Sequence, residues 1–162
     1  MAELICDTSA LIALHQVGLL QILPALSPTV VMPAAVAQEL ATGRSEGHDA
    51  PDVAGLNWLS IRTPAARPAL PDAKLLGVGE SDVLWVALET PGGVAVLDEI
   101  PARRVAGQLG IAFTGTLGLL VDAKNRGMIP AVAPLLLELD RHEFHMSPRI
   151  RETILKAAGE TP

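Results

Sequence analysis

The chain contains little cysteine and few aromatic residues. Its single cysteine, Cys6, excludes an internal disulfide and fits a reducing compartment, so we expect a cytoplasmic protein. Aromatic residues make up 2% of the chain and tyrosine is absent, which argues against a stacking platform for single-stranded nucleic acid.

Long apolar runs are also missing, although 49% of the 162 residues are hydrophobic. Asp, His, Gln, Pro or Gly interrupts each run before it reaches the ~18 residues that a membrane span needs. The N-terminal MAELICDTS lacks the basic region of a secretory signal. We therefore expect the apolar excess to cover a buried sheet and a protein contact. Segments 17–26 and 132–139 are apolar nearly all round, which favours a homodimer.

Positive charge is scarce as well. The chain has 12 basic against 18 acidic residues, a net charge of −6. This balance argues against broad electrostatic capture of nucleic acid but does not exclude nucleic acid as a substrate.

Short β-branched runs alternate with helical patterns along the chain. Strands are predicted at 4–6, 29–32, 58–62, 94–97 and 111–113. Helices are predicted at 10–15, 19–26, 34–42, 81–89, 101–109, 117–126, 130–142 and 148–158. Such alternation predicts βαβ units and a three-layer α/β/α sandwich with a central parallel sheet. We expect a single domain over residues 1–162.

Carboxylates stand where apolar runs meet turns or helix starts. They are Asp7 in LICDTSALIAL, Glu39 in VVMPAAVAQEL, Glu80 and Asp82 in GVGESDVLWVALE, and Asp98 with Glu99 in GVAVLDEIPARR. A parallel sheet brings the carboxyl ends of its strands to one edge, where such side chains gather. Clustered carboxylates repel one another unless a cation lies among them, and Mg²⁺ or Mn²⁺ prefers oxygen ligands. The pattern predicts a metal site for phosphate chemistry, although a residue such as Asp7 is also a common helix cap.

In two pairs of neighbouring acids, Glu80 with Asp82 and Asp98 with Glu99, one member is preferred as the metal ligand. Residues two apart on a helix do not share a face, and the fourth predicted helix is expected to begin near Ser81. Asp82 is therefore preferred as the helix-borne ligand, while Glu80 would reach the pocket from the entry after Gly79. Asp98 is preferred over Glu99 because it lies nearest the strand end.

These segments, together with VLDEIPARRVAGQLGIAFTGTLGLLVDAKNRGMI, resemble the PIN-domain superfamily, and in particular a prokaryotic PIN-like branch. The resemblance covers about residues 4 to 158. It implies a metal-dependent ribonuclease that hydrolyses RNA with Mg²⁺ or Mn²⁺, of the kind found as toxins in toxin–antitoxin pairs. An antitoxin partner and a homodimer are further expectations from this resemblance.

The resemblance also implies roles for particular residues. It places catalytic, metal-binding carboxylates at Asp7, Glu39, Asp82 and Asp98, with Glu80 as a further metal ligand. Hydroxyl groups beside the first and last acids correspond to Ser9 and to Thr114 or Thr116.

Three other interpretations remain open. A catalytically silent PIN-like module would bind only a partner. A phosphoacceptor receiver domain would use Thr114 and Lys124, but its acidic pair is wrongly spaced here. A haloacid-dehalogenase-like phosphatase needs a second aspartate where Ser9 stands. The four histidines show no metal-binding spacing, and His142 and His145 are interpreted as polar helix-end residues.

Overall fold

The computed structural model describes residues 2–162 and centres on one parallel sheet. Its strands are β1 (Leu4–Cys6), β2 (Val30–Pro33), β3 (Leu59–Arg62), β4 (Val94–Val96) and β5 (Ala112–Thr114), in the order β3-β2-β1-β4-β5. Ile5 on the central strand lies opposite Val31 on one side and Ala95 on the other. Both neighbours run parallel to β1, so the carboxyl ends of the strands meet at one edge.

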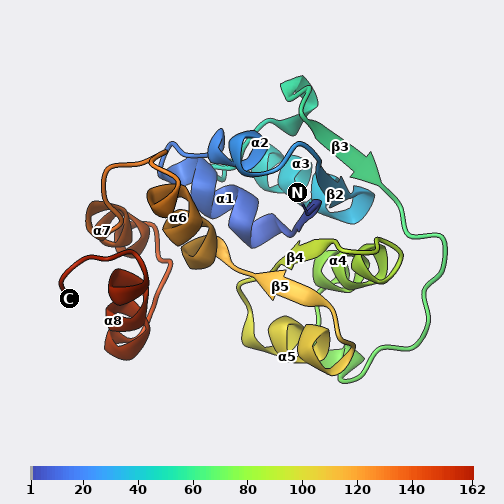
Figure 1. The fold of residues 1–162 in the computed structure, drawn as a ribbon. Coiled ribbons are helices and arrows are strands. Elements are labelled where there is room, and N and C mark those ends of the chain that lie inside the picture. The colour runs from blue at the N-terminus through green and yellow to red at the C-terminus, as the bar shows by residue number, and fades with distance from the viewer. Residues whose placement is uncertain (1) are drawn as a thin grey trace.

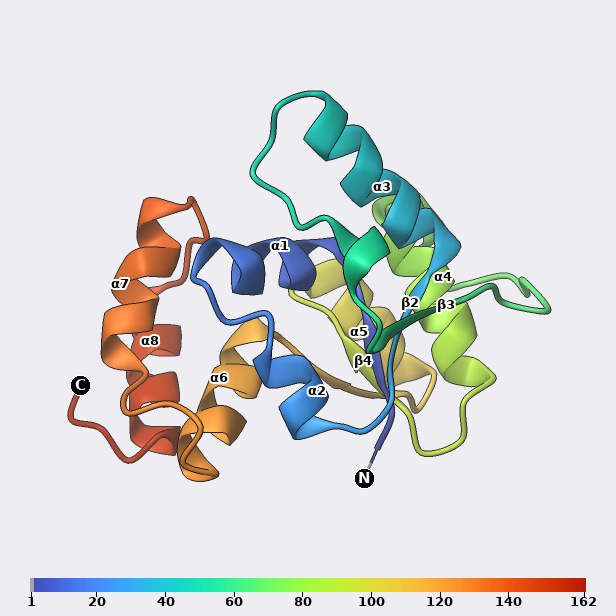
Figure 2. The ribbon, with the colours of Figure 1, turned by 90° about the horizontal axis from the view of Figure 1, so that it is seen from above.

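Helices cover both faces of this sheet. They are α1 (Thr8–Gln16), α2 (Ile22–Leu26), α3 (Ala34–Ser45), α4 (Val78–Leu88), α5 (Ile100–Gln108), α6 (Thr116–Asn125), α7 (Ala133–Arg141) and α8 (Pro148–Ala157), with short 3₁₀ turns at Val53–Gly55 and Ala73–Leu75. Helix α4 packs across β1, β2 and β4, while α1, α2 and α6 pack together on the opposite side (Figures 1 and 2). The predicted three-layer α/β/α sandwich is confirmed.

The apolar excess of the sequence lies mainly inside the molecule. Strand β1 is buried along its whole length, as are Ile22, Leu23 and Leu26 of α2. Leu136 and Leu139 of α7 are buried too. The prediction that segments 17–26 and 132–139 present apolar surface is therefore wrong for most of their large side chains. Neighbouring helices cover them, because α2 contacts α6 and α7 adds its buried face to the same core.

The C-terminal tail contacts both α6 and the start of α7. The Glu160 carboxylate accepts hydrogen bonds from Val132 N at 2.6 Å and Ala133 N at 3.0 Å, at the start of α7. Lys124 of α6 lies 3.6 Å from the same carboxylate and donates to Ala158 O. Within residues 2–162 no helix combines the length and apolarity that a membrane span requires.

Helix α4 begins three residues earlier than the sequence pattern predicts. It starts at Val78, so Glu80 belongs to its first turn. The Glu80 side chain turns back and accepts a hydrogen bond from Gly77 N at 2.8 Å, which satisfies an N–H group that the helix start leaves free. This shift decides which acid faces the site described next.

Candidate functional site

Four carboxylates lie together at the carboxyl edge of the sheet. Asp7 directly follows β1, and Asp98 comes two residues after the neighbouring strand β4. Glu39 comes from α3 and Glu80 from the first turn of α4. The charges of Glu80, Glu39 and Asp98 each raise the pKa of Asp7, because all three lie near enough to repel its ionised form. We call these four residues the acidic cluster.

Asp7 is the buried centre of the cluster. It stands at the N-cap of α1 without making a side-chain cap bond, so capping does not explain it. Burial raises its pKa to about 7, the Thr8 N–H opposes the rise, and the neighbouring carboxylates add to it. The preceding Cys6 is fully buried, and burial followed by the charges of Asp7 and Asp98 raises the pKa of its thiol to about 12.

Asp98 is held by the start of α6. Its two oxygens accept hydrogen bonds from Thr116 N at 2.8 Å and Thr116 Oγ1 at 2.7 Å. Burial raises the pKa of Asp98, while the hydrogen bonds from Thr116 and the nearby Arg103 charge oppose the rise. A Cβ on Gly115 would stand 2.8 Å from Asp98 Oδ1, so the glycine of the TGT segment permits this close approach.

Of the two candidate threonines, Thr116 therefore supports the last acid. Thr114 Oγ1 instead lies against Gly118 of α6, where an added Cβ would clash with it. Lys124, which a receiver domain would need at the site, instead binds the C-terminal tail.

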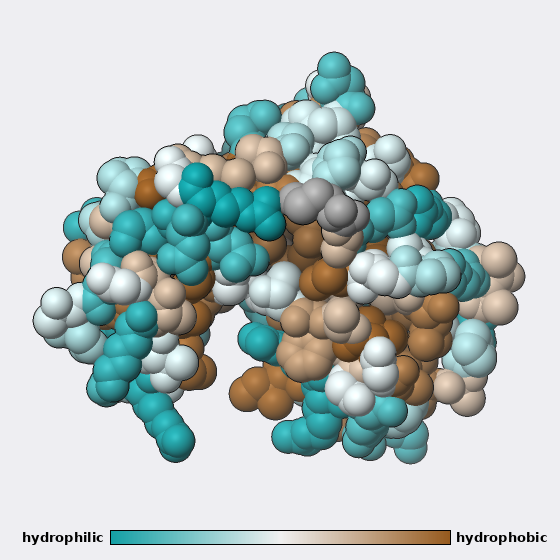
Figure 3. Space-filling model, in the orientation of Figure 1, coloured by the Kyte–Doolittle hydropathy of each residue, from teal (hydrophilic) through white to brown (hydrophobic). Residues whose placement is uncertain are grey.

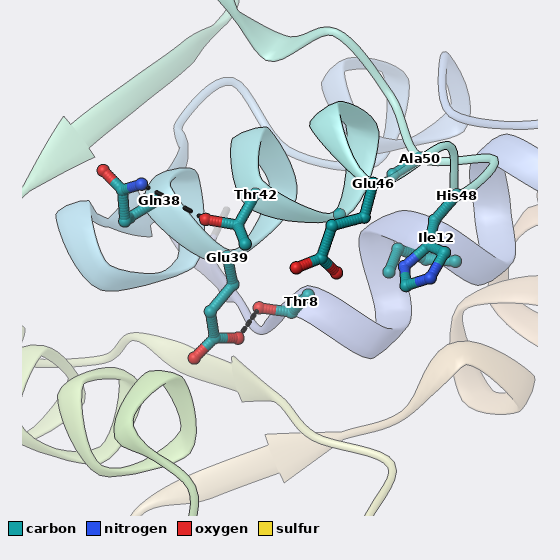
Figure 4. A pocket seen from close by; sticks show the side chains of 9 residues that line it. Thr8, Ile12, Gln38, Glu39, Thr42, Glu46, His48 and Ala50 are labelled. Carbon is teal, nitrogen blue, oxygen red and sulfur yellow. Dashed lines mark hydrogen bonds between the residues drawn. The ribbon is translucent and has the colours of Figure 1, made fainter.

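Glu39 is fixed by two donors from different parts of the chain. Thr8 Oγ1 donates to one carboxylate oxygen, and Gly79 N donates to the other at 2.9 Å. Figure 4 shows Thr8 and Glu39 facing each other between α1 and α3. A Cβ at residue 79 would lie 2.7 Å from Glu39 Oε1, so a larger residue here would displace the Glu39 carboxylate.

Glu80, rather than Asp82, joins the cluster. The Asp82 carboxylate instead faces Arg67 and accepts from its Nε and Nη2, both at 3.3 Å. Glu80, in the first turn of α4, lies near enough to Asp7 for its charge to raise the pKa of Asp7, and a residue two positions later on a helix points elsewhere. The sequence-based preference for Asp82 depended on the later helix start, whereas in the structure Asp82 pairs with Arg67.

Hollows flank the cluster on two sides. One, of about 380 Å³, lies between α1 and α3 beside Thr8 and Glu39 (Figure 4). The other, of about 500 Å³, is lined by Ser9, Asp98 and Arg103 and by the α7–α8 linker. Figure 3 shows a notch where the α7–α8 part of the molecule faces α5.

The second hollow contains residues that the sequence pattern did not assign to the site. His142 and His145 line it from the α7–α8 linker, opposite Asp98 and Arg103. Arg103 also lies over the Phe113 ring, with 5.2 Å between the guanidinium carbon and the ring centroid. The two consecutive arginines that follow the last acids, in PARR, are the sequence feature that could have indicated Arg103. Glu99, the acid not preferred beside Asp98, is exposed at the N-cap of α5.

The donor chemistry of the acidic cluster fits a hard divalent cation. All four groups are carboxylates, and two buried oxygens at the site, Ser9 Oγ and Glu80 Oε2, have no hydrogen-bond partner among the described residues. Within residues 2–162 no three His, Cys, Asp or Glu side chains already surround a common point as the ligands of one ion would. Mg²⁺ commonly keeps several waters and takes only one or two carboxylates directly, so an open arrangement suits it.

The protein is thus an α/β/α sandwich with a cluster of carboxylates at the carboxyl edge of its parallel sheet. The model of a family described as PIN domain matches residues 3–160, nearly the whole chain. The protein therefore belongs to the PIN-domain family, whose members are generally nucleases and typically use divalent metals. A comparison with curated proteins finds no match, so the family model carries this assignment.

Proposed function

We propose that this protein is a metal-dependent endoribonuclease. The observation that carries the proposal is that Glu39, Glu80 and Asp98 lie around the buried Asp7, whose pKa burial and the charges of these three carboxylates raise to about 7. Such repulsion costs free energy in a protein without a bound cation, and a divalent ion would offset it. PIN-family membership supports a nuclease activity, and RNA is the substrate that we propose.

Each residue of the site has a proposed role. A divalent ion held by the acidic cluster would supply an activated water and neutralise charge on the scissile phosphate. Glu39 would be kept in place by Thr8 and Gly79, and Asp98 by Thr116. Arg103 lies beside Asp98 at the mouth of the larger hollow, where its guanidinium would contact a phosphate of the RNA.

Cleavage of a labelled RNA oligonucleotide with Mg²⁺ or Mn²⁺ tests this function. Wild type should cut the RNA, Asp7→Asn should lose most of the activity, and chelation of the metal should abolish it. Asp122→Asn is the matched control, because Asp122 is an exposed acid on α6 outside the cluster. Equal rates for wild type and Asp7→Asn would reject the catalytic assignment and favour a silent interaction module.

We further propose that the protein is the toxin of a toxin–antitoxin pair and acts in the cytoplasm as a homodimer. Several large apolar side chains are exposed: Ile61, Leu75, Val78, Leu88, Ile100, Phe113, Leu137 and Ile150. Val78 is 72% exposed at the start of α4 and Ile100 67% exposed at the start of α5, next to Glu80 and Asp98. Apolar groups at the rim of an acidic site support a protein that covers it, which is the role of an antitoxin. Growth arrest on expression, absent in Asp7→Asn, would test toxicity.

A further inference from the structure

Residues 63–77 form a strap that runs along α4 in the direction opposite to the helix. The contacts follow one another in order. Ala65 N and Ala66 N donate to Glu89 beyond the C-terminal end of α4, at 3.0 and 2.9 Å. Further along, Pro68 O accepts from Trp85 Nε1 at 2.8 Å, and the strap ends at Gly77, immediately before the first turn of α4. The strap is the green segment between β3 and α4 in Figure 1.

Arg67 of the strap forms an ion pair with Asp82 of α4, and we call this pair the latch. Arg67 contacts Asp82 through two nitrogens, each 3.3 Å from a different carboxylate oxygen, which is a bidentate pairing. The Asp82 side chain is 7% exposed and the Arg67 side chain 49% exposed. Arg67 also lies over the Trp85 ring, 5.6 Å from its centroid. A buried carboxylate is costly without a partner, so Arg67 compensates the charge of Asp82 and fixes its direction.

The Arg67–Asp82 pair contacts the same turn of α4 that carries Gly79 and Glu80. Asp82 follows Gly79, which donates to Glu39, by three residues, and it follows Glu80 by two. One helical residue rises ~1.5 Å, whereas metal–ligand distances hold to about 0.2 Å. A small rotation or slip of this turn would therefore displace the contacts of two cluster carboxylates together.

We propose that the Arg67–Asp82 latch is a positioning device that sets Glu39 and Glu80 for metal binding. Asp82 is thus a positioning residue rather than a metal ligand. This inference rests on the proposed function, because it assumes that the acidic cluster holds the metal.

The test measures the Kd for Mn²⁺ by electron paramagnetic resonance, well below the melting temperature of each variant. Arg67→Ala and Asp82→Asn should each raise this Kd about tenfold, as is typical when a group that orients a metal ligand is removed. Arg67→Lys keeps the charge but not the paired donors, so its Kd should fall between those of wild type and Arg67→Ala.

A second ion pair provides the matched control. Arg44 and Asp52 are also 3.3 Å apart but 47% and 61% exposed, and they line a different hollow from the two beside the cluster. Arg44→Ala should leave the Mn²⁺ Kd unchanged, whereas a general effect of losing an ion pair would change it. If Arg67→Ala does not fold, Arg67→Lys and Asp82→Asn decide the question.

The other outcomes separate the latch from the function. If wild type binds Mn²⁺ and Arg67→Ala binds it equally well, the latch is refuted and the proposed function stands. If Asp82→Asn weakens binding while Arg67→Ala does not, Asp82 is itself a ligand and the positioning role is refuted. Wild type that fails to bind Mn²⁺ would reject the proposed function, and the latch inference with it.

Discussion

Replacing Asp7 with asparagine should make the metal-free protein more stable at neutral pH. Burial and like charges raise the pKa of Asp7 from 3.8 to about 7. Each tenfold change in proton affinity corresponds to ~1.4 kcal/mol, so ionised Asp7 costs the folded state about 4 kcal/mol. Asparagine has a similar shape and no charge, and it avoids this cost.

The sign of the pH dependence follows from the direction of the shift. Below pH ~4 Asp7 is protonated in both the folded and the unfolded chain and costs nothing. Between pH ~4 and ~7 the unfolded chain loses this proton first, so the free energy of unfolding falls as the pH rises. Asp7→Asn removes that fall, and its advantage over wild type should grow across this pH range.

Urea unfolding followed by tryptophan fluorescence in the presence of a chelator provides the measurement. At pH 8 the variant should exceed wild type by up to about 4 kcal/mol, or roughly 10 °C in melting temperature, and near pH 4 the two should coincide. Asp122→Asn should follow wild type at every pH. A variant that is no more stable than wild type at pH 8, or whose advantage does not depend on pH, would refute the reasoning.

Three further outcomes are expected. Mn²⁺ at a hundred times its Kd should stabilise wild type by ~2.7 kcal/mol in a thermal scan and leave Asp7→Asn unchanged; no shift in wild type would count against the metal site. Gly79→Ala should weaken Mn²⁺ binding at least about tenfold, because its Cβ would lie 2.7 Å from Glu39 Oε1, whereas Gly55→Ala meets no atom within 4 Å and should bind normally. Light scattering should give the mass of two chains, since large apolar side chains remain exposed, and a single-chain mass would contradict the homodimer.

The fold could be predicted from the sequence because the signals are local and repeated. Five short apolar runs separated by helical patterns leave few arrangements besides a parallel sheet covered on both faces. The same logic placed Asp7 and Asp98 at one edge, since each directly follows a buried run.

The choice between Glu80 and Asp82 could not be made from the sequence in the same way. The two glycines of GVGESD resemble a loop, and the start of α4 depends on a bond from Gly77 N to the Glu80 side chain. Arg67 lies in a proline-rich segment with no periodicity, so no local sequence pattern predicts its contact with Asp82. The apolar residues of α2 and α7 were misassigned to the surface, because a sequence does not show how many neighbouring helices cover a helix.

Because Cys6 is buried, the reaction of its thiol with a labelling reagent reports when the folded structure opens around β1. A fully buried thiol with a pKa of about 12 is almost never a thiolate in the folded state, so a disulfide reagent can react only after β1 separates from its neighbours. Because the chain has one cysteine, the labelling rate measures that single event. Cys6 immediately precedes Asp7, so a cation that stabilises the closed form should slow labelling, and metal occupancy can be followed without any RNA substrate.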